Sequence, residues 1–139
     1  MTNPIAVPGF DHIVLRVRDK PRMLAFYCGV LGLAVDRDRP EIGLTHVRAG
    51  GQLIDLVTLD GPLGAAGGAP PGPEGRNLDH FALQVRPFDV KAIRAHLAAH
   101  GVTVVDEGRR YGAQGDGHSL YVRDPEGNTV ELKGPPEAS

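Results

Sequence analysis

The segment Leu78-Asp79-His80-Phe81-Ala82-Leu83-Gln84-Val85 repeats, with few changes, the earlier segment Phe10-Asp11-His12-Ile13-Val14-Leu15-Arg16-Val17. Apolar and polar residues alternate in both segments, and such alternation predicts half-buried β-strands. Because successive side chains of a strand point to opposite faces, His12 and His80 lie opposite the main apolar residues of their strands. The chain therefore carries two matched strands, each of which begins with Asp-His.

The duplication extends beyond these strands. Leu31-Gly32-Leu33 matches His100-Gly101-Val102, and Ile54-Asp55-Leu56 matches Val130-Glu131-Leu132. Between the copies lies a segment rich in Gly and Pro, which is typical of a linker. We therefore predict one domain over residues 1–139, with a first module at 9–60, a linker at 61–76, a second module at 77–134 and a loose tail at 135–139.

Each module is predicted to contain a strand, a helix and three further strands. In the first module, a helix begins after Asp19 and ends at Gly32, because Asp is a good N-cap and Gly a good C-terminal stop. A short strand at 33–35, a polar turn at 36–41 and strands at 44–49 and 52–59 follow. In the second module, we expect a helix from Asp89 to Gly101, a strand at 102–105, a loop at 108–117 and strands at 119–123 and 129–133.

Composition argues against several classes of function. The 139 residues carry a formal net charge of −2 and no block of like charges, so we expect neither nucleic acid nor a membrane surface as a partner. No apolar run approaches the length of a membrane span, and no signal peptide is visible. The single cysteine, Cys28, excludes an internal disulfide framework and suits the cytoplasm.

The chemistry is expected on the faces that bear histidine and carboxylate. Alternation places Asp55 and Glu131 opposite the apolar residues of their strands, as it does His12 and His80. Two imidazoles and two carboxylates from matched strands could converge on one point between the modules. Such a set suits a divalent Fe, Mn, Ni, Co or Zn ion. Taken alone, however, a histidine on a strand is more often structural than a ligand.

Four stretches carry a resemblance to a known family: Asp11-His12, Phe26-Tyr27-Cys28-Gly29-Val30-Leu31-Gly32-Leu33, Leu78-Asp79-His80, and the last two strands from Tyr121 to Leu132 with the turn Asp124-Pro125-Glu126-Gly127. The chain resembles the vicinal oxygen chelate superfamily, which includes glyoxalase I, extradiol dioxygenases and bleomycin-binding proteins. The resemblance implies an α+β fold in which two tandem βαβββ modules form a cupped, mostly antiparallel sheet with helices on its outer face. The activity is less specific, since many reactions share this fold.

The resemblance also implies roles for individual residues. His12, His80 and Glu131 fall on the common metal-ligand positions of the family, and the cofactor is one divalent metal ion. Asp55 falls where some members carry a fourth ligand, and it could instead serve as the catalytic base. Tyr121 is expected to be catalytic. Arg16, which shares a face with His12, and Ser119 are expected to bind the substrate.

Two classes of function follow. The first is a metal-dependent enzyme, a lyase or isomerase or a ring-cleaving dioxygenase, acting on a small oxygenated metabolite by bidentate chelation and oxyanion stabilisation. The alternative is a metal-free protein that binds a drug or metabolite. The resemblance suggests a homodimer, and the sequence leaves open whether the site lies within one chain or between two.

Overall fold

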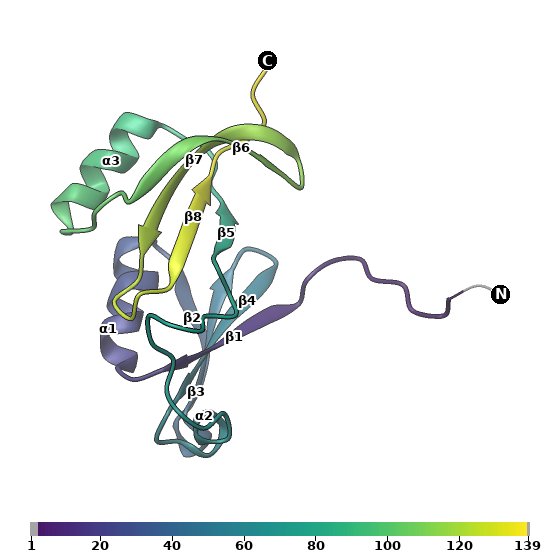
Figure 1. Ribbon diagram of the computed structural model, residues 1–139, viewed down its shortest axis with the longest axis vertical. Helices are drawn as coiled ribbons and strands as arrows, with labels where there is room; N and C mark the ends of the chain where they lie inside the picture. The colour runs from purple at the N-terminus through teal and green to yellow at the C-terminus, as the bar shows by residue number, and fades with distance from the viewer. Residues whose placement is uncertain (1–2, 139) are drawn as a thin grey trace.

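The first half of the chain forms a four-stranded sheet in the computed structural model, which describes residues 3–138 (Figure 1). The strand order is β1-β4-β3-β2. β1 runs parallel to β4, and the other neighbours are antiparallel. The elements are β1 (His12–Val17), α1 (Lys20–Leu24), its π-helical continuation η1 (Ala25–Val30), β2 (Ala34–Arg39), the 3₁₀ turn η2 (Pro40–Ile42), β3 (Leu44–Ala49) and β4 (Gln52–Thr58).

The second half repeats this arrangement. Its strand order, β5-β8-β7-β6, again has a parallel first pair and two antiparallel pairs. The elements are α2 (Pro62–Ala65) in the connecting segment, β5 (Phe81–Gln84), α3 (Val90–Ala99), β6 (Asp106–Gly112), β7 (Gly115–Arg123) and β8 (Thr129–Lys133). The α+β fold of tandem βαβββ modules with mostly antiparallel sheets is therefore confirmed. β1 and β5 occupy the corresponding edges of their two sheets.

Two strands differ from the sequence prediction. The predicted polar turn at 36–41 is wrong in its first part, because β2 continues to Arg39. Residues 102–105 are not a strand, and the predicted loop at 108–117 is instead largely β6 and β7. Both β2 and β6 are edge strands whose residues are mostly exposed. Edge strands often carry charged residues, and their sequences therefore lack the apolar alternation that marks a half-buried strand.

The helix boundaries follow from local chemistry. Asp19 caps α1 by accepting a hydrogen bond from the backbone N–H of Arg22 at 3.1 Å. The helical segment continues as η1, and Gly32 follows it with a φ of 76°, a left-handed conformation that favours glycine. In the second module, Asp89 caps α3 through the N–H of Ala92. These ends agree with the predicted N-caps and glycine stops.

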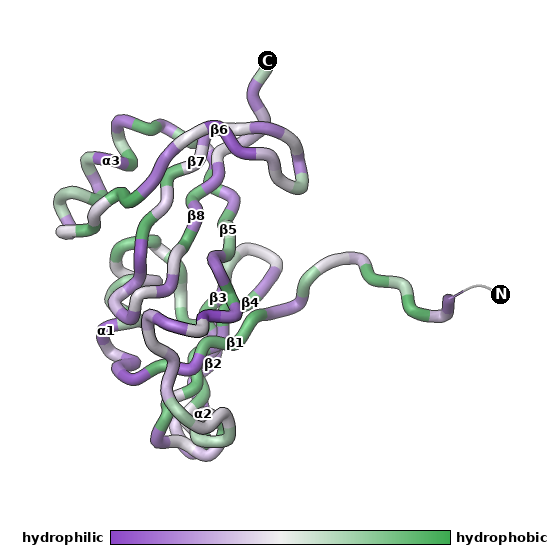
Figure 2. The backbone as a smooth tube through the Cα atoms, viewed as in Figure 1, coloured by the Kyte–Doolittle hydropathy of each residue, from purple (hydrophilic) through white to green (hydrophobic). Residues whose placement is uncertain are grey.

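The core joins the two modules on their helical side. Figure 2 shows hydrophobic and hydrophilic residues alternating along the strands, and one buried cluster includes residues of both sheets and of η1 and α3. The turn after β7 adds polar links: Glu126 accepts hydrogen bonds from the N–H groups of Arg18 and Asp19, and the buried Tyr27 hydroxyl donates to Asp124 at 2.7 Å. These hydrogen bonds attach the second module to the start of α1 and to η1, and so they hold the two modules together.

Within the part of the chain that the structure describes, no helix has the length and apolarity needed to cross a membrane. The segment before β1 extends away from both sheets (Figure 1). It exposes Ile5, Val7 and Phe10.

Candidate metal centre

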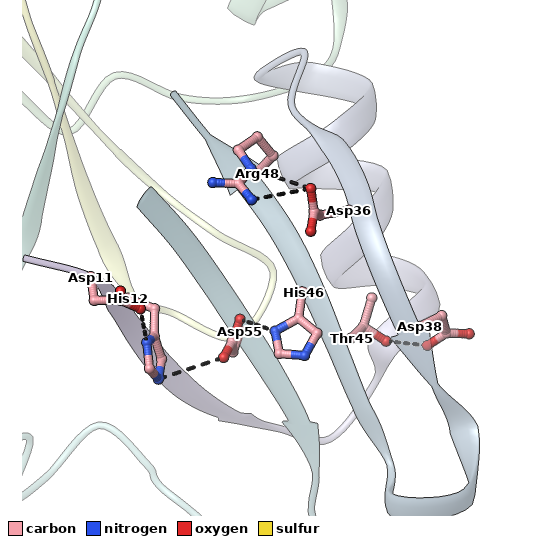
Figure 3. A network of polar contacts seen from close by, with 8 residues as sticks. All are labelled: Asp11, His12, Asp36, Asp38, Thr45, His46, Arg48 and Asp55. Atoms are coloured by element: carbon pink, nitrogen blue, oxygen red, sulfur yellow. Dashed lines mark hydrogen bonds and ion pairs between the residues drawn. The ribbon is translucent and has the colours of Figure 1, made fainter. Parts of the chain in front are cut away.

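The first module brings Asp55 between two histidines (Figure 3). Asp55 is on β4, the central neighbour of β1 and β3, and its side chain is only 5% exposed. Its Oδ1 lies 2.7 Å from Nδ1 of His46 on β3, and its Oδ2 lies 3.8 Å from Nε2 of His12 on β1. The register explains His46, because it pairs directly with Asp55 across the antiparallel ladder. One oxygen of the carboxylate is thus bound by His46, while the other faces His12.

The second module repeats this arrangement with Glu131. Glu131 is on β8, buried, with Oε1 3.1 Å from Nε2 of His80 and Oε2 accepting a 2.6 Å hydrogen bond from the Ser119 hydroxyl. Ser119 is itself fully buried on β7. Each module therefore presents one imidazole Nε2 and one carboxylate oxygen, and a further polar side chain holds the second oxygen of that carboxylate.

The Asp-His dipeptides orient the two imidazoles. Asp11 Oδ1 lies 2.6 Å from Nδ1 of His12, and Asp79 Oδ2 lies 2.7 Å from Nδ1 of His80. The hydrogen bond to Asp11 is the main cause that raises the pKa of His12; desolvation lowers it by less, and the charges of Asp55 and Asp11 add smaller upward effects. A carboxylate on one ring nitrogen directs the other nitrogen outward and increases its basicity, as in histidines that ligate metals.

Tyr121 lies beside the second pair. Its ring makes an edge-to-face contact with His80, and the two ring centroids are 5.5 Å apart. The Arg110 guanidinium lies over the Tyr121 ring, 5.5 Å from its centroid. Tyr121 pairs directly with Glu131 across the β7–β8 ladder. Burial and the neighbouring Glu131 carboxylate raise the pKa of the Tyr121 hydroxyl, so it remains a proton donor at neutral pH.

Arg16 contacts the connecting segment. Its guanidinium donates hydrogen bonds to the carbonyl oxygens of Gly64, Gly68 and Ala69 at 2.9, 2.7 and 3.1 Å. Arg16 thus shares a face with His12, as its position in the strand requires, but its donors are engaged by the backbone between the modules.

The four predicted metal-site side chains form two pairs. His12 faces Asp55 in one sheet, and His80 faces Glu131 in the other. Over residues 3–138, no three His, Cys, Asp or Glu side chains lie close enough together to hold one metal ion. The donor chemistry of each pair fits a divalent transition metal. Each pair alone, however, supplies fewer donors than a divalent ion normally takes.

His46 has no role predicted from the sequence. The residue lies on the same face of the first sheet as Asp55 and His12, as Figure 3 shows. Only its position in β3 could have indicated this role, because a residue that pairs with Asp55 in the observed register lies on the same face of the sheet as that carboxylate.

Comparisons with known proteins agree with this architecture. Residues 9–132 match the glyoxalase/bleomycin resistance protein/dioxygenase superfamily. The glyoxalase domain-containing protein RDO1 of Mycosarcoma maydis is 30% identical over 139 residues, covering 92% of this chain and 69% of that protein.

Two solved structures have the same fold. An integron cassette protein from the mobile metagenome of V. cholerae is 28% identical, with a TM-score of 0.72 over 94% of this chain and 97% of that chain. Lactoylglutathione lyase from Agrobacterium tumefaciens is 23% identical, with a TM-score of 0.68 over 93% and 95% of the two chains. Since the family match covers nearly the whole chain, the protein belongs to the glyoxalase/bleomycin resistance protein/dioxygenase superfamily.

Proposed function

We propose that the protein is a divalent-metal-dependent enzyme that acts on a small oxygenated metabolite. The observation that carries the proposal is the repeated half-site, in which an Asp-backed imidazole faces a buried carboxylate in each module. Fixed donors of this kind are typical of metal centres. A single stabilising ion pair would not require the same Asp-His-carboxylate arrangement in both modules.

The complete site is assembled by two copies of the chain. His12 and Asp55 of one copy meet His80 and Glu131 of the other, which supplies the three or four protein donors that a divalent Fe, Mn, Ni, Co or Zn ion requires. The first strands of the two modules support this arrangement, because β1 and β5 are both edge strands, and within residues 3–138 no strand pairs with their outer edges. Phe10, just before β1, and Val14, within β1, are exposed and add apolar surface at this edge.

The side chains of the proposed site have different roles in binding and proton transfer. When bound, the metal ion supplies Lewis-acid stabilisation of negative charge that develops on substrate oxygens. Asp55 accepts a proton from a carbon next to a substrate carbonyl and returns it to the neighbouring carbon. His46 holds one oxygen of Asp55, and Ser119 does the same for Glu131, so both carboxylates keep their positions. The Tyr121 hydroxyl donates to a substrate oxygen near His80.

Two reaction classes share this framework. If Asp55 is the base, the reaction is a lyase or isomerase reaction, the class to which the lactoylglutathione lyase of Agrobacterium tumefaciens belongs. If only His12, His80 and Glu131 bind the metal, the reaction is ring cleavage by a dioxygenase. We favour the isomerase class, because Asp55 is buried, lies 3.8 Å from His12 Nε2 and is held in place by His46.

The single free cysteine suits a reducing compartment such as the cytoplasm.

Replacing Asp55 by Ala tests the reaction class. We expect the variant to lose isomerase activity towards small α-hydroxycarbonyl compounds by roughly 10²–10⁴-fold, the usual contribution of a general base. Asp60→Ala removes an exposed carboxylate just beyond β4 and is the matched control, with activity unchanged. Activity on catechols that survives Asp55→Ala would instead assign a dioxygenase.

Metal content separates the enzyme from the alternative of a metal-free drug- or metabolite-binding protein. We expect protein purified without chelator to contain about one divalent ion per chain by elemental analysis, because a dimer would hold two sites. Removal of the ion with a chelator should abolish catalysis, and the divalent ion alone should restore it. A chain that binds small molecules equally well with and without metal would support the alternative.

A further inference from the structure

A cavity of about 290 Å³ opens beside the His80–Glu131 pair. Its walls are β5, β8 and the hairpin that joins β6 to β7. Ala82 pairs with Glu131 across the two parallel strands, and this small side chain leaves space in front of the carboxylate. The volume lies at the lower end of the range for small-molecule sites. The cavity therefore suits a metabolite of few atoms that also reaches the candidate metal ligands.

Lys133 brings a positive charge into this cavity. It lies two residues after Glu131 on the same face of β8, about 7 Å further along the strand. Its ammonium group donates to the carbonyl oxygen of Arg110 at 2.9 Å, which leaves two of its three donors free. Gly112 lies under the aliphatic stem, where a Cβ atom would collide with the lysine. The hairpin thus holds the ammonium group in a defined position.

The charges around the cavity do not neutralise Lys133. Among the described lining residues, the only carboxylate is Glu131, and its two oxygens are engaged by His80 and Ser119. Gln84 pairs with Lys133 across the β5–β8 ladder, and Gln114 lines the cavity from the hairpin. One ammonium and two residues with amide side chains therefore line the same cavity as the candidate metal ligands.

We propose that this cavity binds a substrate that carries a carboxylate, and that Lys133 is the counter-ion of that carboxylate. The inference rests on the proposed metal-dependent function and names its substrate class: a small metabolite with metal-chelating oxygens at one end and a carboxylate at the other. One ammonium with two amide donors matches the single charge and two oxygens of a carboxylate. A phosphate group would call for more cationic side chains than this cavity offers.

Two hydroxamates of equal length test the proposal on the Co²⁺-loaded protein. Succinic acid monohydroxamate and butyrohydroxamate share the same chelating group, but only the first carries a carboxylate at its far end. We expect the intact protein to bind the carboxylated compound about tenfold more tightly by calorimetry, as one charge-assisted contact allows. Lys133→Met should reduce this preference to within about twofold, and Lys133→Arg should retain most of it.

Lys91→Met is the matched control. Lys91 is an exposed residue of α3, so its replacement makes the same change in net charge away from the cavity and should leave the preference intact. An unchanged preference in Lys133→Met would overturn the assignment of Lys133, while retained Co²⁺ and butyrohydroxamate binding would leave the proposed metal site standing. Failure of the intact protein to retain Co²⁺ would instead refute the metal site and, with it, this inference.

Discussion

Replacing His80 by Ala is expected to weaken divalent metal binding by more than about 100-fold. Loss of an outer partner that only orients a ligand typically costs 10–100-fold, so loss of a ligand itself should cost more. Asp79→Asn provides that intermediate case, because Asp79 is hydrogen-bonded to Nδ1 of His80 and not to its Nε2, the nitrogen that faces Glu131. Equilibrium dialysis against Zn²⁺ or Co²⁺, followed by elemental analysis, measures both effects on the same scale.

The control for this series is His100→Ala. His100 lies at the C-terminal end of α3, is exposed and contacts the carbonyl oxygen of His96. Its loss removes one imidazole from the chain without touching either half-site, so metal affinity should not change. Equal metal content in the His80→Ala and His100→Ala proteins would show that His80 is not a ligand.

The second large effect concerns the shared site. We expect a heterodimer of one His12→Ala chain and one His80→Ala chain, isolated by two affinity tags, to bind about half the metal of the unmodified dimer. In such a pair, the intact second module of one chain meets the intact first module of the other and forms one complete site. The parent homodimers lack one histidine at every site and should bind little metal.

A reversed pairing completes this experiment. When both substitutions are in one chain and its partner is unmodified, every shared site lacks one histidine, and metal binding should be lost. Sites confined to single chains predict the opposite pattern: no binding in the first heterodimer and about half occupancy in the second. The two pairings therefore distinguish the arrangements whatever the absolute affinity is.

The duplicated strands were predictable because their signal is local. Alternation in the Asp-His segments sets which side chains share a face, and the structure places His12 near Asp55 and His80 near Glu131 as that parity requires. The N-caps Asp19 and Asp89 were equally predictable, since a cap depends only on the next turn of chain.

Features set by pairing between distant segments were harder to predict. β2 and β6 are strands because β3 and β7 pair with them, although their own residues are polar and exposed. The contact of His46 with Asp55 depends on the register of β3 against β4. Likewise, no local pattern reveals that Arg16 binds the backbone of the connecting segment.

The repeated half-site has a consequence for the origin of the fold. Each module already contributes one Asp-backed imidazole and one buried carboxylate from equivalent strands. Two unlinked copies of a single ancestral module, related by a twofold axis, would present the same four donors as the fused chain. In the present chain the two halves differ at this point, since Asp55 contacts a histidine, whereas Glu131 contacts a serine and is followed two residues later by a lysine.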